Sequence, residues 1–351
     1  MKALSWGILG PNTSTPLGRL WALRSFFFGV LVYDLISITF KHAARYGVDG
    51  FNVSHLSWID AILPLPSPTL VGTLWVLCAF AACFAALNVY PATAIRVVAF
   101  IYGGIYLWSQ IDSYQHHYLN ALIALMLAIL PNRIWRTVPT EDAPPFTSPF
   151  VGLIYVQFGL VYLWTAIAKL DPTWLSGATM MSIGHGDQLL VFTSYVSEVV
   201  YGTSGDPSLA MDALYQTLSV LVIAGEILVA LCYFCPRLRY VGLVLAPMFH
   251  LSVEFLGLDI ELFSLYMIGI NLILLSPDRL WKSLDKWREK SAGVRSTVWL
   301  NTWLNTGTAI VVELHRLRVE GFMVLPVKRE QDHLAATRPE VASATLGLLG
   351  S

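Results

Sequence analysis

Charged residues are scarce in this chain. They make up 13% of its 351 residues, whereas soluble globular domains contain roughly 25%. The formal net charge is −1, so the sequence lacks the basic field that nucleic-acid binding requires. Only four cysteines occur, and Cys78 and Cys83 lie inside an apolar run where a thiol behaves as a small hydrophobe. These shortages argue against a soluble domain, a nucleic-acid partner and a disulfide framework.

Long apolar runs are abundant instead. Hydrophobic residues make up 56% of the chain, and a membrane span needs about 20 mostly apolar residues. The runs show no period-two alternation, so helices are expected to satisfy the backbone in hydrocarbon. The sequence predicts an all-α, polytopic transmembrane helix bundle with about eight spans, at residues 21–40, 70–90, 92–110, 117–131, 150–169, 213–234, 240–257 and 260–276.

The distribution of lysine and arginine predicts the orientation. Cytoplasmic connections of membrane proteins are enriched in both residues, and alternate connections of this chain collect most of them. Both termini are therefore expected in the cytoplasm. The resulting organisation is a cytoplasmic lead-in at 1–19, a transmembrane domain at 20–281 and a short cytoplasmic tail at 282–351.

Ionisable side chains at membrane depth are the candidates for function, because each is costly there unless it is paired or hydrated. We single out five catalytic candidates: Lys169, His116, His250, Glu254 and Glu226. His250 and Glu254 are one helical turn apart and share a face. The neighbours expected to bind substrate are Gln115, Tyr118, Trp174, Asp171 and Tyr162.

These residue types suit proton transfer. A lysine that is partly desolvated can lose its proton and act as a base, and a histidine can donate a hydrogen bond to a developing oxyanion. Two structural interpretations stay open: Lys169 could pair with Asp171 at the surface, and His250 with Glu254 could bond across helices. No ligand-pair spacing indicates a metal site, and we predict none.

Several motifs resemble those of one family. The run Tyr114-Gln-His116-His-Tyr118-Leu119 resembles the (N/Q)-H-x-Y-L segment of the vitamin K-dependent γ-carboxylases and their wider relatives, the HTTM membrane domains. The stretch from Tyr162 to Gly177 resembles that family's Y-x-x-A-G-x-x-K-L-x-x-x-W-x-x-G signature. Phe249-His250-Leu251 is similar to its F-H-L helix.

The resemblance implies a role for particular residues. In the carboxylase, the lysine matching Lys169 deprotonates reduced vitamin K, and the histidine matching His116 assists the chemistry of the quinol oxygen. Reduced quinone, oxygen and carbon dioxide are the implied co-substrates. The chain departs from the family pattern at Val253, where an asparagine is usual, and only about 70 residues follow its last span. We therefore expect the membrane core with its base, without protein carboxylation.

Three functions compete on this sequence. The first is a membrane enzyme that uses Lys169 and His116 to abstract a proton from, or oxygenate, a membrane-dissolved isoprenoid or quinol. The second is an isoprenoid (terpene) cyclase on the same scaffold, started by an acid from the set Glu226, Glu254, Asp259 and Glu261. The third is a non-enzymatic interaction or maturation protein. All three predict a multi-pass protein of the endoplasmic reticulum in a eukaryote, or of the plasma membrane in a bacterium, with membrane lipid as its surroundings.

Overall fold

The computed structural model describes residues 14–111, 115–140, 142–183, 193, 195–196, 198–199, 207–255 and 262–291. The chain divides into two compact units, Met1–Glu313 and Leu314–Ser351, and every described residue belongs to the first. The tail expected at 282–351 thus lies outside the described residues beyond Ser291. The helix α15 continues through the expected boundary at residue 281.

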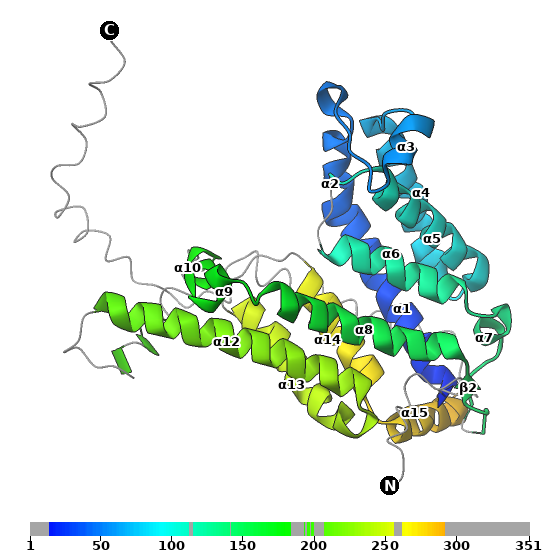
Figure 1. Ribbon diagram of the computed structural model, residues 1–351. Helices are drawn as coiled ribbons and strands as arrows, with labels where there is room; N and C mark the ends of the chain where they lie inside the picture. The colour runs from blue at the N-terminus through cyan, green and yellow to red at the C-terminus, as the bar shows by residue number, and fades with distance from the viewer. Residues whose placement is uncertain are drawn as a thin grey trace. The chain divides into compact units, whose positions relative to one another are not determined.

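Helices dominate the described residues (Figure 1). The longer ones are α1 (Leu17–Asp34), α4 (Pro68–Ala86), α5 (Pro91–Trp108), α6 (Gln115–Ala128), α8 (Pro149–Ala168), α12 (Pro207–Phe234), α13 (Arg239–Phe255), α14 (Phe263–Leu275) and α15 (Asp278–Ser291). Short elements connect them: η1 (Leu35–Thr39), α2 (Phe40–His42), η2 (Ala43–Arg45), η3 (Val48–Gly50), α3 (Ser57–Ile62), α7 (Asn132–Arg136), α9 (Pro172–Leu175), α10 (Ala178–Ile183) and η4 (Pro236–Leu238). The two-residue strands β1 (Ser14–Thr15) and β2 (Phe146–Thr147) pair antiparallel.

The predicted helical segments are confirmed, and each of the eight predicted ranges falls on a helix. Among the described residues, five helical segments are long and apolar enough to cross a membrane: Leu17–Arg45, Pro68–Ala86, Pro91–Trp108, Pro149–Ala168 and Asp212–Phe234. The apolar helices His116–Ala128 and Phe263–Leu275 are shorter. Thirteen residues of helix rise about 20 Å, less than the roughly 30 Å of a hydrocarbon core. The count of eight spans and the cytoplasmic termini stay predictions.

Proline starts several of these helices. Pro68, Pro91 and Pro149 each occupy the first turn, where the missing N–H costs nothing and the fixed φ favours helix. Ser148 caps α8 by accepting from the backbone N–H of Phe150. Local sequence therefore sets where α8 begins, and the length of the helix, 20 residues, places Lys169 directly after its C-terminal end.

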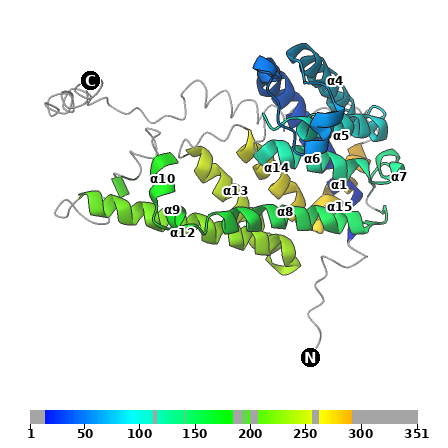
Figure 2. The same ribbon diagram turned by 45° about the horizontal axis from the view of Figure 1, so that its top comes forward.

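The packing of the helices places that C-terminal end. Helices α8 and α12 lie side by side in both views (Figures 1 and 2). They are antiparallel, since Gly159 faces Phe234 while Lys169 meets Glu226. The core of this contact is a stack of rings in which Tyr233 lies 5.7 Å from Phe158 and 6.1 Å from Tyr162 between centroids.

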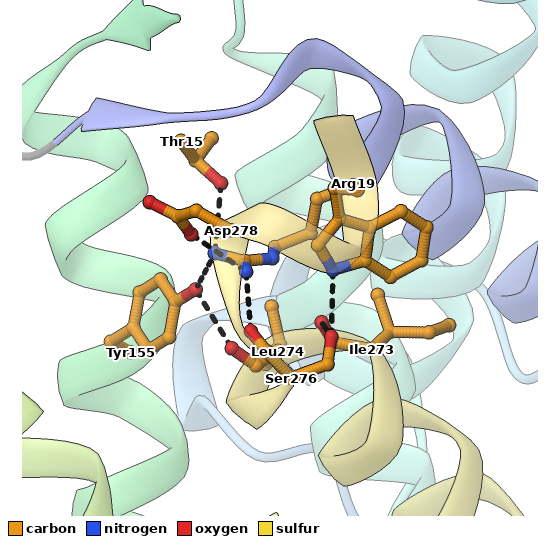
Figure 3. A network of polar contacts seen from close by, with 8 residues as sticks. Thr15, Arg19, Tyr155, Ile273, Leu274, Ser276 and Asp278 are labelled. Atoms are coloured by element: carbon orange, nitrogen blue, oxygen red, sulfur yellow. Dashed lines mark hydrogen bonds and ion pairs between the residues drawn. The ribbon is translucent and has the colours of Figure 1, made fainter. Parts of the chain in front are cut away.

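A buried arginine ties the opposite end of the bundle together (Figure 3). Arg19 of α1 is 1% exposed and donates to the Ser276 carbonyl at 2.5 Å and to the Tyr155 hydroxyl at 3.0 Å. It also pairs with Asp278 at 2.8 Å, and Tyr155 donates to the Leu274 carbonyl at 2.9 Å. This network fixes α1, α8 and the start of α15 around the end of α14.

Candidate functional site

Lys169 lies where α8 ends and forms an ion pair with Glu226 of α12. Its Nζ is 2.8 Å from Oε1 and 3.0 Å from Oε2 of Glu226, and it donates to the Thr165 carbonyl at 3.4 Å. The lysine side chain is 17% exposed and the glutamate 7%. The structure therefore joins two of the five catalytic candidates, across 57 residues of sequence.

The segment after Lys169 covers its amine. Asp171 caps α9 by accepting from the backbone N–H groups of Thr173 (2.8 Å) and Trp174 (3.3 Å). The Thr173 hydroxyl also donates to Asp171 and, as the main cause, lowers the pKa of that carboxyl group. The cap positions the Trp174 ring, whose centroid is 5.3 Å from Lys169 Nζ, within cation–π range. Asp171 thus orders the cover, and it is not the partner of the lysine.

Gly177 completes this cover. Its φ is +82°, and a Cβ there would lie 2.5 Å from the backbone nitrogen of Gln216 and 2.7 Å from the carbonyl carbon of Tyr215. Only glycine combines that conformation with such a close approach to the α12 backbone. Each signature residue therefore has its own role: Lys169 supplies the charge, Trp174 covers it, and Gly177 allows close packing against α12.

A second group of side chains lies along α8, α12, α13 and α14. The Tyr162 hydroxyl is 2.7 Å from Nε2 of His250, and Asn271 donates to Tyr162 at 2.8 Å. Tyr233 donates to the Asn271 carbonyl oxygen at 2.5 Å. His250 is 2% exposed, and its ring contacts Phe263 edge-on. Two predicted site residues, Tyr162 and His250, are in direct contact.

A third group surrounds Asp34, the last residue of α1. Asp34 is fully buried and accepts from Thr39 (3.2 Å), Asn120 (3.5 Å) and Tyr266 (3.5 Å). The turn that follows it, η1, is a π-helix, a feature that often accompanies functional sites. The Tyr102 hydroxyl accepts from Asn120 at 3.3 Å and lies 2.6 Å from Nδ1 of His117.

His116 belongs beside this third group. It is 4% exposed, and its ring centroid lies 4.1 Å from that of His117. The hydrogen bonds of the Lys169 amine go to Glu226 and Thr165, so no direct bond joins it to His116. The two residues assigned to catalysis by resemblance thus have different immediate neighbours.

The remaining predicted residues are less involved. Tyr118 is 44% exposed, and its hydroxyl accepts from Gln157 at 3.4 Å. Glu254 follows His250 by one turn and is partly exposed. The side chain of Gln115 lies outside the described residues, as do Asp259 and Glu261. In the described part of the chain, no group of three or more His, Cys, Asp or Glu side chains is arranged to hold a metal ion.

Sequence reasoning missed several members of these groups. Asp34 and Asn271 stand inside predicted spans, and a polar residue in an apolar run is a signal in itself. Tyr102 and Tyr233 gave no such signal, because tyrosine is common in membrane helices.

An apolar cavity of about 420 Å³ lies beside the third group. Residues of α1, η1, α2 and α4 line it: Val32, Leu35, Ile36, Phe40, Trp75, Val76, Ala79, Phe80 and Cys83. The Trp75 ring packs at 5.2 Å from that of Tyr102, which links the cavity wall to the buried polar groups.

A scan against protein-family models matches the HTTM domain over residues 12–281. The chain belongs to the HTTM domain family. The match confirms the family predicted from the motifs, and it covers every helix from α1 to α14. HTTM domains are membrane domains linked to the vitamin K-dependent carboxylases. Searches of curated proteins and of solved structures gave no match.

Membership of the HTTM family gives the signature a place in the fold. In this HTTM domain, the stretch from Tyr162 to Gly177 runs from the second polar group to the covered ion pair. One motif therefore contributes to two of the three polar groups.

Proposed function

We propose that this HTTM protein is a multi-pass membrane enzyme whose Lys169–Glu226 pair removes a proton from a lipid-soluble isoprenoid or quinol substrate. The observation that carries the proposal is the pair itself. It consists of an amine and a carboxylate in bidentate contact at 2.8 and 3.0 Å, largely shielded from solvent, at the end of a helix apolar enough to span a membrane.

The two side chains act as one proton acceptor. In the resting state the pair carries one shared proton, bound either to the Lys169 amine or to the Glu226 carboxylate. When a substrate hydroxyl donates a second proton to the carboxylate, the pair becomes a protonated acid beside an ammonium group. The remaining positive charge then stabilises the substrate oxyanion, and shielding from water strengthens that attraction.

The buried histidines support the same chemistry. His116, by its resemblance to the carboxylase histidine, and His250, by its burial, can hydrogen-bond a substrate oxygen. The cavity of about 420 Å³ beside the third group offers space for an apolar chain. Oxygen is the co-substrate expected if the substrate is a quinol.

Acid-initiated cyclisation is less compatible with the pair. A cyclase needs the Glu226 carboxyl group to deliver a proton to the substrate, but both of its oxygens are in contact with the Lys169 amine, at 2.8 and 3.0 Å. The cover of Trp174 over the Lys169 amine is compatible with either reaction. The occupation of both carboxyl oxygens therefore favours the base-driven reaction.

Substitution with lipid analysis separates the two reactions. Each variant is produced in the native host, and the lipid extract is compared by mass spectrometry. Lys169→Ala and Glu226→Gln should both abolish product, because the acceptor works as a pair. Lys41→Ala is the matched control, since Lys41 is an exposed lysine remote in sequence from the pair, and it should leave product unchanged. A product lost in Glu226→Gln but kept in Lys169→Ala would establish the cyclase instead.

A further inference from the structure

Each hydrogen bond of the Asn271 side chain has a defined donor and a defined acceptor. Its Nδ2 donates to the Met267 carbonyl at 2.6 Å, and a carbonyl can only accept, so the orientation of the amide is fixed. Its oxygen then accepts from Tyr233, and its nitrogen also donates to the Tyr162 hydroxyl. Every hydrogen bond of this amide is accounted for without ambiguity.

These assignments determine which ring nitrogen of His250 carries the hydrogen. The Tyr162 hydroxyl accepts from Asn271, so its own hydrogen goes to Nε2 of His250, 2.7 Å away. A neutral imidazole that accepts at Nε2 carries its hydrogen on Nδ1. The chain Tyr233, Asn271, Tyr162 therefore selects one tautomer of His250.

The resulting Nδ1–H is an unused donor. His250 is 2% exposed, and Nδ1 has no hydrogen-bond partner among the residues that the structure describes. The neighbouring rings of Phe249 and Phe263, with centroids at 5.3 and 5.7 Å, offer no oxygen. A buried donor left without a partner is costly, and three other side chains hold this one in place.

We propose that the Nδ1–H of His250 anchors an oxygen atom of a lipid-soluble quinol, and equally the carbonyl oxygen of the corresponding quinone. A single neutral donor among aromatic rings selects an uncharged molecule with an acceptor oxygen, and it discriminates against ions and against plain hydrocarbons. This inference rests on the proposed function and names how its substrate class is recognised. The competing structural role is an N–H directed at the face of the Phe263 ring.

Ligand binding tests the anchor without turnover. The full chain in lipid nanodiscs is titrated with an oxidised naphthoquinone carrying an isoprenoid tail, followed by tryptophan fluorescence, and in parallel with the oxygen-free hydrocarbon of the same tail. His250→Phe should weaken quinone binding roughly tenfold, the equivalent of one hydrogen bond, and leave hydrocarbon binding unchanged. The control His55→Phe, which removes a partly exposed imidazole stacked on Tyr106, should bind both as the unaltered protein does.

A second measurement needs no substitution at the histidine. The infrared carbonyl stretch of the bound quinone should shift to lower frequency in the unaltered protein, and Tyr162→Phe should reduce that shift because Nε2 no longer has its donor. An unshifted carbonyl, or equal loss of quinone and hydrocarbon binding in His250→Phe, would overturn the anchor and leave the contact with Phe263. Binding of the oxidised quinone involves no proton removal, so these two measurements judge the anchor separately from the proposed proton acceptor, which only turnover of the reduced form tests.

Discussion

Removing both members of the Lys169–Glu226 pair should destabilise the protein by less than the sum of the two single removals. Breaking a buried ion pair by removing one partner costs about 3–5 kcal/mol, because a charge is left uncompensated. Glu226 is 7% exposed and Lys169 is 17% exposed, so the two single variants should differ. Lys169→Met strands the more buried charge and should cost about 3 kcal/mol, whereas Glu226→Gln leaves an ammonium that can turn towards water and should cost about 2 kcal/mol.

The double variant measures the interaction itself. Lys169→Met with Glu226→Gln removes both charges, and replacing a whole buried pair is often close to neutral. We expect a total cost of about 2 kcal/mol, mostly from the buried amide, which corresponds to a coupling energy of about 3 kcal/mol. Side chains in direct contact commonly show coupling of this size.

Equilibrium unfolding in mixed micelles gives these values. The purified variants are titrated with a denaturing detergent, and helix content is followed by circular dichroism. Lys41→Met, at an exposed lysine, serves as the control for loss of a lysine and should change the midpoint little. Additive costs in the double variant would refute the pairing, since independent residues add.

Two further predictions concern the cover over Lys169. Asp171→Ala removes the cap of α9 and should increase amide hydrogen exchange across α9, while Asp171→Asn keeps a capping oxygen and should increase it less. Because the pKa of Asp171 is lowered in the folded protein, the stabilisation by its carboxylate is present above the ordinary pKa of about 4 and is lost as the pH falls through the folded value. Unchanged exchange in Asp171→Ala would contradict the cap. Gly177→Ala combines a strained φ with a clash against the α12 backbone, so it should lower the free energy of unfolding by at least about 2 kcal/mol. A thermal midpoint unchanged from that of the control Gly103→Ala, where a Cβ meets open space, would contradict this.

Much of the fold follows from local sequence. Apolar runs bounded by proline place the helices, and Pro149 behind the capping Ser148 sets the start of α8 almost where it was expected. The predicted span 117–131 is offset from α6, which ends at Ala128, because the apolar run continues past the helix to Pro131. An apolar run thus predicts that a helix is present more reliably than it predicts the residue at which the helix ends.

The partners within the site depend on packing that sequence does not reveal. Asp171 stands two residues from Lys169 and looked like its counterion, but the run Asp-Pro-Thr-Trp is also a helix start with proline at the first position. The cap uses the carboxylate, and the antiparallel contact of α8 with α12 brings Glu226 to the amine. Asn271 was missed because only ionisable residues within the spans were taken as candidates, and its amide is neutral.

Oxygen uptake reports directly on proton removal from a quinol by the Lys169–Glu226 pair. The purified protein in vesicles is given a chemically reduced naphthoquinone with an isoprenoid tail, and dissolved oxygen is recorded with an electrode before and after the addition. Uptake should depend on the protein, fall to the background rate in Lys169→Ala and in Glu226→Gln, and persist in Lys41→Ala. Uptake that continues undiminished in both pair variants would contradict a proton acceptor built from Lys169 and Glu226.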